Sequence, residues 1–173
     1  MSTKLKLVFA IAMLLSTSIF AKGPRVNLQV AIIQGNIKAV EQHIKAETDL
    51  NIKESTGGST PLITACTFGK TEIAKALIDA GADLNIQNND GSTALITASF
   101  FCRTEIVQYL LDAGANQTIT NHVGSTAIQS VMAPFDAVKP IYEAIENGLK
   151  PLGFKLDYKH LEKTRPIIAE MLK

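Results

Sequence analysis

The sequence contains a segment that repeats at a spacing of 33 residues. GSTPLITA at residues 58–65 is followed by GSTALITA at 91–98, and a third copy begins with GSTAI at 124–128. The segments IDAGA at 78–82 and LDAGA at 111–115 repeat at the same spacing. A fixed period of this length is typical of a repeat array, in which each unit buries its apolar face only against its neighbours.

The repeated unit resembles an ankyrin repeat. Residues 60–65, TPLITA, match the T-P-L-H-x-A signature of that family, except that Ile63 stands in place of the histidine. Residues 72–85 and 105–116 resemble the second helix of an ankyrin repeat and the entry to the next finger. The resemblance covers most of the chain after residue 25. It implies an all-α repeat solenoid of helix-turn-helix units joined by β-turn fingers.

The period divides the chain into about four units, which together form a single domain over residues 22–173. We expect a C-terminal capping segment over 154–173, after repeats at approximately 27–54, 55–87, 88–120 and 121–153. Terminal repeats are often atypical. In the fourth unit, which contains Pro134 and Pro140, we expect the outer helix over residues 141–147.

The first 21 residues have the composition of a secretory signal peptide. Lys4 and Lys6 precede an apolar run over residues 7–15, and Ala21 supplies a small residue for cleavage. The apolar run is shorter than the roughly 20 residues that cross a membrane. We therefore expect cleavage near Ala21 after export, with an uncleaved anchor as the alternative. A small exported chain without a disulfide framework favours a bacterial periplasm.

The charge balance argues against a nucleic-acid partner, and the two cysteines leave one possible disulfide. Without Lys4 and Lys6, 15 basic residues face 16 acidic residues, so no basic surplus is available for a nucleic-acid backbone. Cys66 and Cys102 are the only cysteines, and they fall three positions out of register in adjacent units. A buried, unbridged Cys66 is the favoured interpretation, and a disulfide is the alternative.

The sequence lacks a pattern of catalytic or metal-binding residues. GKT at residues 69–71 resembles the end of a phosphate-binding loop, but Thr64 stands where that motif needs glycine. His43, His122 and His160 are spread over three units without a second ligand at a metal-like spacing. We therefore predict no enzyme, no cofactor and no metal site.

The ankyrin resemblance implies a binding surface on the concave face, made of the finger tips and the exposed side of the inner helices. On this sequence the implied contact residues are Thr67, Phe68, Phe100, Phe101, Asn89, Asp90, Ser92, His122, Val123 and Ser125. Aromatic side chains with a polar rim are typical of a binding hot spot. The alternative is that the aromatic residues fill space between the inner helices. Neighbouring helical side chains diverge by about 100°, so one of Phe100 and Phe101 should be partly exposed.

These features predict a monomeric, non-enzymatic interaction protein of the cell envelope, with no membrane span after cleavage. It would bind a periplasmic partner protein through its concave face. A narrower hypothesis is that it inhibits, or protects against, a periplasmic enzyme such as a wall hydrolase. The alternatives are an accessory factor for an exported enzyme, and a small-molecule or metal-binding envelope protein that uses His122.

Overall fold

The computed structural model describes residues 24–173, and the predicted signal peptide lies outside these residues. Within the described part, the regular elements are all helices, which confirms the all-α solenoid. In chain order they are α2 (Leu28–Ile33), α3 (Ile37–Lys45), α4 (Pro61–Thr67), α5 (Thr71–Asp79), α6 (Ala94–Phe100), α7 (Thr104–Asp112), α8 (Ala127–Met132), α9 (Phe135–Leu149), the 3₁₀ helix η1 (Lys150–Leu152) and α10 (Tyr158–Met171).

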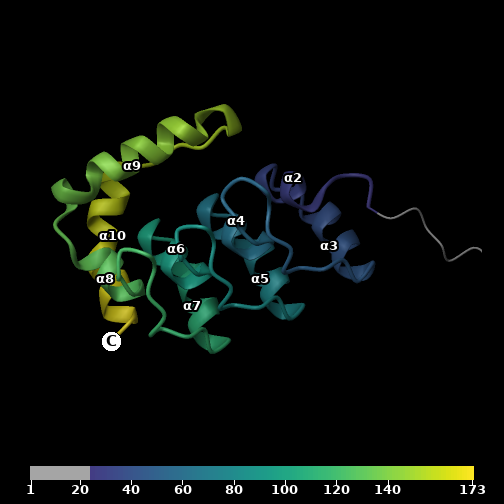
Figure 1. The fold of residues 1–173 in the computed structure, drawn as a ribbon, viewed down its shortest axis with the longest axis horizontal. Coiled ribbons are helices and arrows are strands. Elements are labelled where there is room, and N and C mark those ends of the chain that lie inside the picture. Colours follow the sequence, from purple (N-terminus) through teal and green to yellow (C-terminus); the bar gives the residue numbers. More distant parts are fainter. Residues whose placement is uncertain (1–23) are drawn as a thin grey trace, which may run out of the picture.

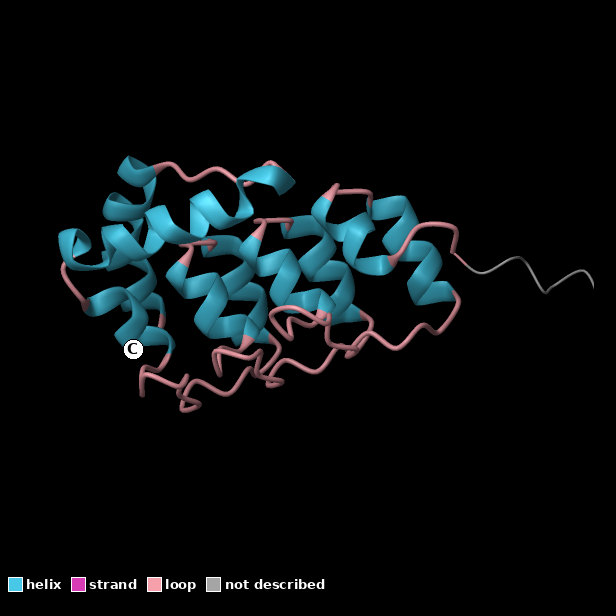
Figure 2. Cartoon of the chain, turned by 45° about the horizontal axis from the view of Figure 1, so that its top comes forward, coloured by secondary structure: helices cyan, strands magenta, loops and turns pink. Residues whose placement is uncertain are grey.

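The helices of the repeats form two stacked rows (Figure 1). The inner row contains α2, α4, α6 and α8, and the outer row contains α3, α5, α7 and α10. Each inner helix also packs against the outer helix of its own unit. The fingers project from one edge of this array, where Figure 2 shows the loops in pink.

Threonine residues cap the N-termini of the inner helices α4, α6 and α8, whereas an asparagine caps α2. The Thr60 hydroxyl accepts a hydrogen bond from the Ile63 N–H at 3.3 Å, and the Thr93 hydroxyl accepts one from the Ile96 N–H at the same distance. Each bond satisfies an N–H group that the helix itself cannot pair. Pro61 occupies the first turn of α4, where its missing N–H costs nothing.

Backbone hydrogen bonds close each finger and join it to the next. A bond of 3.0 Å links the two ends of each turn, from residue 54 to 59, from 88 to 92 and from 121 to 125. The first turn is therefore one residue longer than the others. Between fingers, the Asn89 N–H donates to the Gly57 carbonyl and the His122 N–H donates to the Asp90 carbonyl, both at 2.9 Å. The fingers consequently form a continuous ladder.

The two cysteines are free and buried, so the disulfide alternative is not formed. Cys66 is fully buried in the core between the helix rows. Burial raises the pKa of its thiol to about 12, against the opposing positive charge of Arg103. Because the thiolate is the reactive form, Cys66 serves as a small core residue.

The fourth unit differs from the expectation. Residues 141–147, expected as its outer helix, belong to the longer α9, while α10 takes the outer position beside α7 and α8. The reason is that Leu161 and Ile168 on α10, together with Leu172 at its C-terminal cap, form a buried apolar face at helical spacing. The predicted cap at 154–173 therefore supplies the last outer helix, and residues 133–157 form an insertion within the fourth unit.

Candidate functional site

The helix α9 is held over the inner row by one central side chain. Tyr142 is completely buried, and its hydroxyl donates to the Phe100 carbonyl at 2.6 Å. The same hydroxyl accepts a hydrogen bond of 2.9 Å from the Arg165 guanidinium on α10. The rings of Tyr142 and Phe100 stack with their centroids 4.4 Å apart. This anchor fixes α9 against the C-terminal end of α6.

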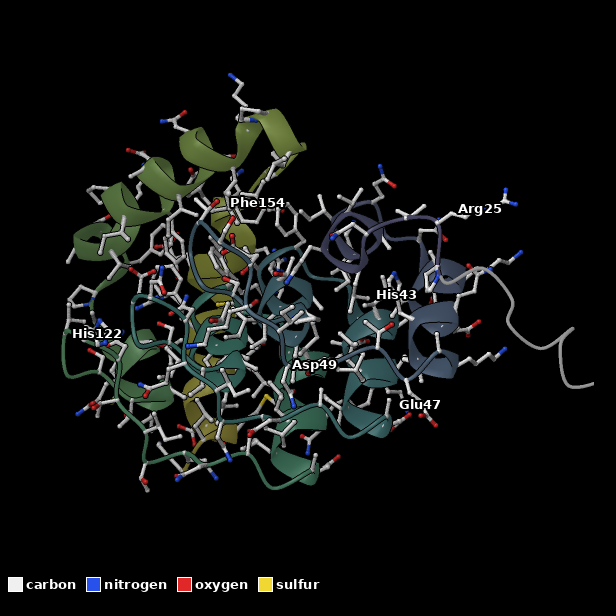
Figure 3. The ribbon with its side chains drawn as sticks, turned by 45° about the vertical axis from the view of Figure 1, so that its right-hand side comes forward. Arg25, His43, Glu47, Asp49, His122 and Phe154 are labelled. Carbon is white, nitrogen blue, oxygen red and sulfur yellow. The ribbon has the colours of Figure 1, made fainter. Side chains whose placement is uncertain are left out.

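The segment after α9 adds a second anchor. Phe154 is buried, and Figure 3 shows it between α9 and the repeat helices. Its ring makes edge-to-face contacts with Phe68 at 5.5 Å and with Phe101 at 5.6 Å between centroids. Offset and edge-to-face geometries are the favourable arrangements for aromatic pairs. The aromatic residues of the inner helices therefore hold the insertion in place.

This packing changes the interpretation of the phenylalanine cluster. Phe101 is only 5% exposed, so the space-filling alternative describes it better than a contact role. Phe68 and Phe100 are half-buried, and both keep part of their surface on the concave side, where they line the groove described next. The expectation that one of the two consecutive residues is partly exposed is met by Phe100.

The insertion converts the concave face into a groove of about 970 Å³. The fingers form one side, the inner helices form the floor and α9 forms the opposite wall. All predicted contact residues except Asn89 line this groove. The Asn89 amide instead donates to the Thr56 carbonyl at 3.2 Å and supports the finger ladder.

The wall supplied by α9 was not anticipated from the sequence. It contributes a set of apolar side chains from α9 and η1, namely Val138, Ile141, Ile145, Leu149 and Leu152. Ile141 is 51% exposed and Leu152 is 50% exposed. Across the groove, the Val123 side chain on the third finger is 83% exposed. Apolar side chains that are left open inside a concave site indicate a surface that buries on binding.

The finger side of the groove is polar and acidic. Among the described residues that line the groove, the residues with full charges are Glu54 and Asp90, both acidic. The Glu54 carboxylate accepts hydrogen bonds from the N–H groups of Thr56 and Gly57, each at 2.6 Å, and of Ser59 at 3.1 Å. Burial opposes its ionisation, but these bonds outweigh that effect and hold the pKa of Glu54 below its ordinary value.

The histidines named in the sequence analysis are not grouped as metal ligands in the described part of the chain. His43 is buried and its Nε2 lies 2.7 Å from the Val26 carbonyl, while His122 is exposed at a finger tip. Figure 3 shows these two histidines at opposite ends of the array. Within residues 24–173, no three His, Cys, Asp or Glu side chains are close enough together to hold a metal ion. No helix in the same range is both long and apolar enough to cross a membrane.

Stacked helical pairs, a ladder of fingers and an open concave groove define a repeat protein of the binding class. A family profile described as ankyrin repeats, in three copies, matches residues 28–121, which is more than half of the chain. The chain belongs to the ankyrin-repeat family. Ankyrin repeats are protein–protein interaction modules, and this architecture serves binding rather than one particular chemistry.

Two curated relatives and one solved structure are similar to parts of the chain. Mouse protein phosphatase 1 regulatory subunit 27 is 39% identical over 63 residues, which is 36% of this chain and 40% of the relative. The human protein of the same name is 38% identical over the same shares. The chain thus matches well under two thirds of their length. The ankyrin repeat domain of Bcl-3 aligns with a TM-score of 0.57 and 26% identity, over 60% of this chain and 45% of that one.

Proposed function

We propose that this chain is a non-enzymatic binding protein of the cell envelope that holds a segment of a partner protein in its groove. The observation that carries the proposal is the open apolar surface inside the groove, where Val123, Ile141 and Leu152 are each at least half exposed. Full burial of an exposed side chain of this size contributes roughly 1.5–3 kcal/mol, so covering a half-exposed one contributes about half of that. Membership of a family of interaction modules supports the same reading.

Export to the periplasm is part of the proposal and depends on the signal-peptide pattern in residues 1–21. Lys4 and Lys6, followed by a short apolar run, have the composition that directs secretion. A partner would accordingly be another envelope or exported protein. Cell fractionation with an antibody against the C-terminal helix tests the location.

We further propose that binding regulates an enzyme. The name of the mouse relative describes it as a regulatory subunit of a phosphatase, and a groove that covers a protein segment can act in the same general way. For this chain the proposed target is an exported enzyme such as a wall hydrolase, which the chain inhibits. Assay of the captured partner with and without the chain distinguishes inhibition from assistance.

The experiment is an affinity purification from the source organism with the chain carrying a C-terminal tag. A groove variant with Val123→Ser and Ile141→Ser is compared with a control variant with Ile52→Ser and Ile167→Ser. The control residues are 58% and 49% exposed, and they lie outside the groove. The proposal expects a partner that the native chain and the control retain and the groove variant loses. Equal retention by both variants contradicts it.

A further inference from the structure

The apolar wall of the groove has the pattern of a helix-packing surface. Val138, Ile141, Ile145 and Leu149 recur every three or four residues along α9, and Leu152 extends the row into η1. Val138, Ile145 and Leu149 pack partly against the core, while Ile141 and Leu152 are about half exposed and open to the groove. Residues at this spacing share one face of a helix. A helix of 15 residues is about 22 Å long at about 1.5 Å per residue. The wall therefore matches roughly four turns of a second helix laid alongside it.

The remainder of the groove favours a helix over an extended segment. Extended peptides bind mainly by adding a strand to a sheet edge, whereas amphipathic helices lay an apolar face into a groove. Residues 24–173 contain no β-strand, so this part of the chain has no sheet edge to extend. The groove floor offers the half-buried rings of Phe68 and Phe100, which suit the apolar face of an inserted helix.

The rim opposite α9 selects the charge of that helix. Glu54 and Asp90 are acidic, and the described groove lining includes neither lysine nor arginine. The backbone of Asp90 takes part in the finger ladder, while its side chain is exposed at the second finger. Opposite charges across an interface raise the association rate and select the partner.

We propose that the bound segment is an amphipathic α-helix of the partner protein that carries lysine or arginine along one edge. Its apolar face packs against α9 and the aromatic floor, and its basic edge meets Asp90 and Glu54. This inference rests on the proposed function, because it specifies what occupies the same groove. It adds the conformation and the charge of the occupant.

The test uses three designed peptides of 18 residues and the purified full chain with a C-terminal tag. The first peptide is an amphipathic helix of leucine, alanine and lysine. The second has glutamate in place of every lysine, and the third has the composition of the first in an order without an apolar face. Fluorescence anisotropy gives each Kd at low and at high salt. We expect the basic amphipathic peptide to bind at least tenfold more tightly than either other peptide.

Two variants with matched controls locate the site. Asp90→Lys should raise the Kd of the basic peptide by about threefold to tenfold, which is the range expected when an exposed ion pair is reversed. Asp112→Lys, at an exposed position outside the groove, should leave Kd unchanged. Ile141→Ser should weaken binding by about tenfold or more through lost apolar burial, and Ile167→Ser on α10 should have no effect.

The outcomes separate this inference from the proposed function. Equal binding of the basic and acidic peptides, or equal effects of Asp90→Lys and Asp112→Lys, overturns the inference. If the natural partner is lost from the groove variant but the basic peptide neither binds nor competes with that partner, the inference fails and the proposed function stands. If the groove variant retains the partner, both fail.

Discussion

Gly91 lies where the second finger contacts the third. Its φ is +75°, and an added Cβ atom would lie 2.8 Å from the backbone nitrogen of His122. Gly114 has a similar φ of +80°, but nothing lies within 4 Å of its Cβ position. A side chain at either site strains the backbone by about 1–2 kcal/mol. At Gly91 it must also displace the backbone of the next finger.

We therefore expect Gly91→Ala to lower the free energy of unfolding more than Gly114→Ala does. The measurement is urea denaturation of both variants and the native chain, followed by circular dichroism. A difference of about 1 kcal/mol or more between the two variants would report the finger contact, within the usual range for strained sites. Equal losses in the free energy of unfolding would mean that the next finger moves away from residue 91 at no measurable cost.

The first finger depends on the charge of Glu54. Its three backbone hydrogen bonds lower the pKa of this carboxyl in the folded state. A carboxyl whose pKa is lowered by folding stabilises the fold at any pH above its unfolded-state pKa of about 4.3. This contribution is lost as the pH falls through the folded-state pKa. We expect Glu54→Gln to lower the stability at pH 7 by about 1–2 kcal/mol. Its deficit relative to the native chain should shrink below pH 4. The same substitution at exposed Glu41 serves as the control in urea titrations.

At the scale of elements, α9 depends on the polar contacts of one tyrosine. Burial raises the pKa of Tyr142 to about 12, against the opposing effect of Arg165, so the hydroxyl keeps its proton and donates to Phe100. The Arg165 side chain is 3% exposed and also donates to the Ala133 carbonyl at 2.7 Å. Loss of the hydroxyl would leave both the Phe100 carbonyl and one Arg165 N–H without this partner.

We expect Tyr142→Phe to cost about 1–3 kcal/mol, the usual penalty for an unsatisfied buried polar group. Hydrogen exchange should become faster in α9 before it does in α4 to α7, because local opening begins where contacts are fewest. Mass-spectrometric exchange measures this directly. Tyr109→Phe on α7, where the native side chain is half-buried, is the control. Uniform acceleration across all helices would contradict the role assigned to Tyr142.

The sequence was sufficient to predict the repeats, but it was not sufficient to predict where the insertion packs. The threonine N-caps, Pro61 and the 33-residue period are features of local sequence. They therefore predict the helices of each repeat without knowledge of the fold. The position of α9 depends instead on pairs such as Tyr142 with Phe100 and Phe154 with Phe68, which are distant in sequence. The apolar pattern of residues 138–149 fits an outer helix equally well. A usable signal in the sequence was the spacing of Leu161, Ile168 and Leu172, which fits the apolar face of an outer helix.

The whole molecule is an array with two different long faces. The outer helices α3, α5 and α7 lie along one face, and α9 lies on the opposite side of the inner helices (Figure 1). The face with α9 also carries the fingers and the floor of the groove. Nine of the ten contact residues expected from the sequence line the groove, but the wall that makes it a groove came from the insertion. We propose that a partner protein is held inside this groove.

Site-specific photo-crosslinking in the source organism shows whether a partner protein lies in the groove. A photoreactive amino acid replaces Val123 or Ile141 in the groove, and Ile52 or Ile167 outside it, one position at a time. We expect an adduct with the same partner at positions 123 and 141, and none at positions 52 and 167. Adducts only at positions 52 or 167 would place the partner on another face and rule out the groove as its binding site.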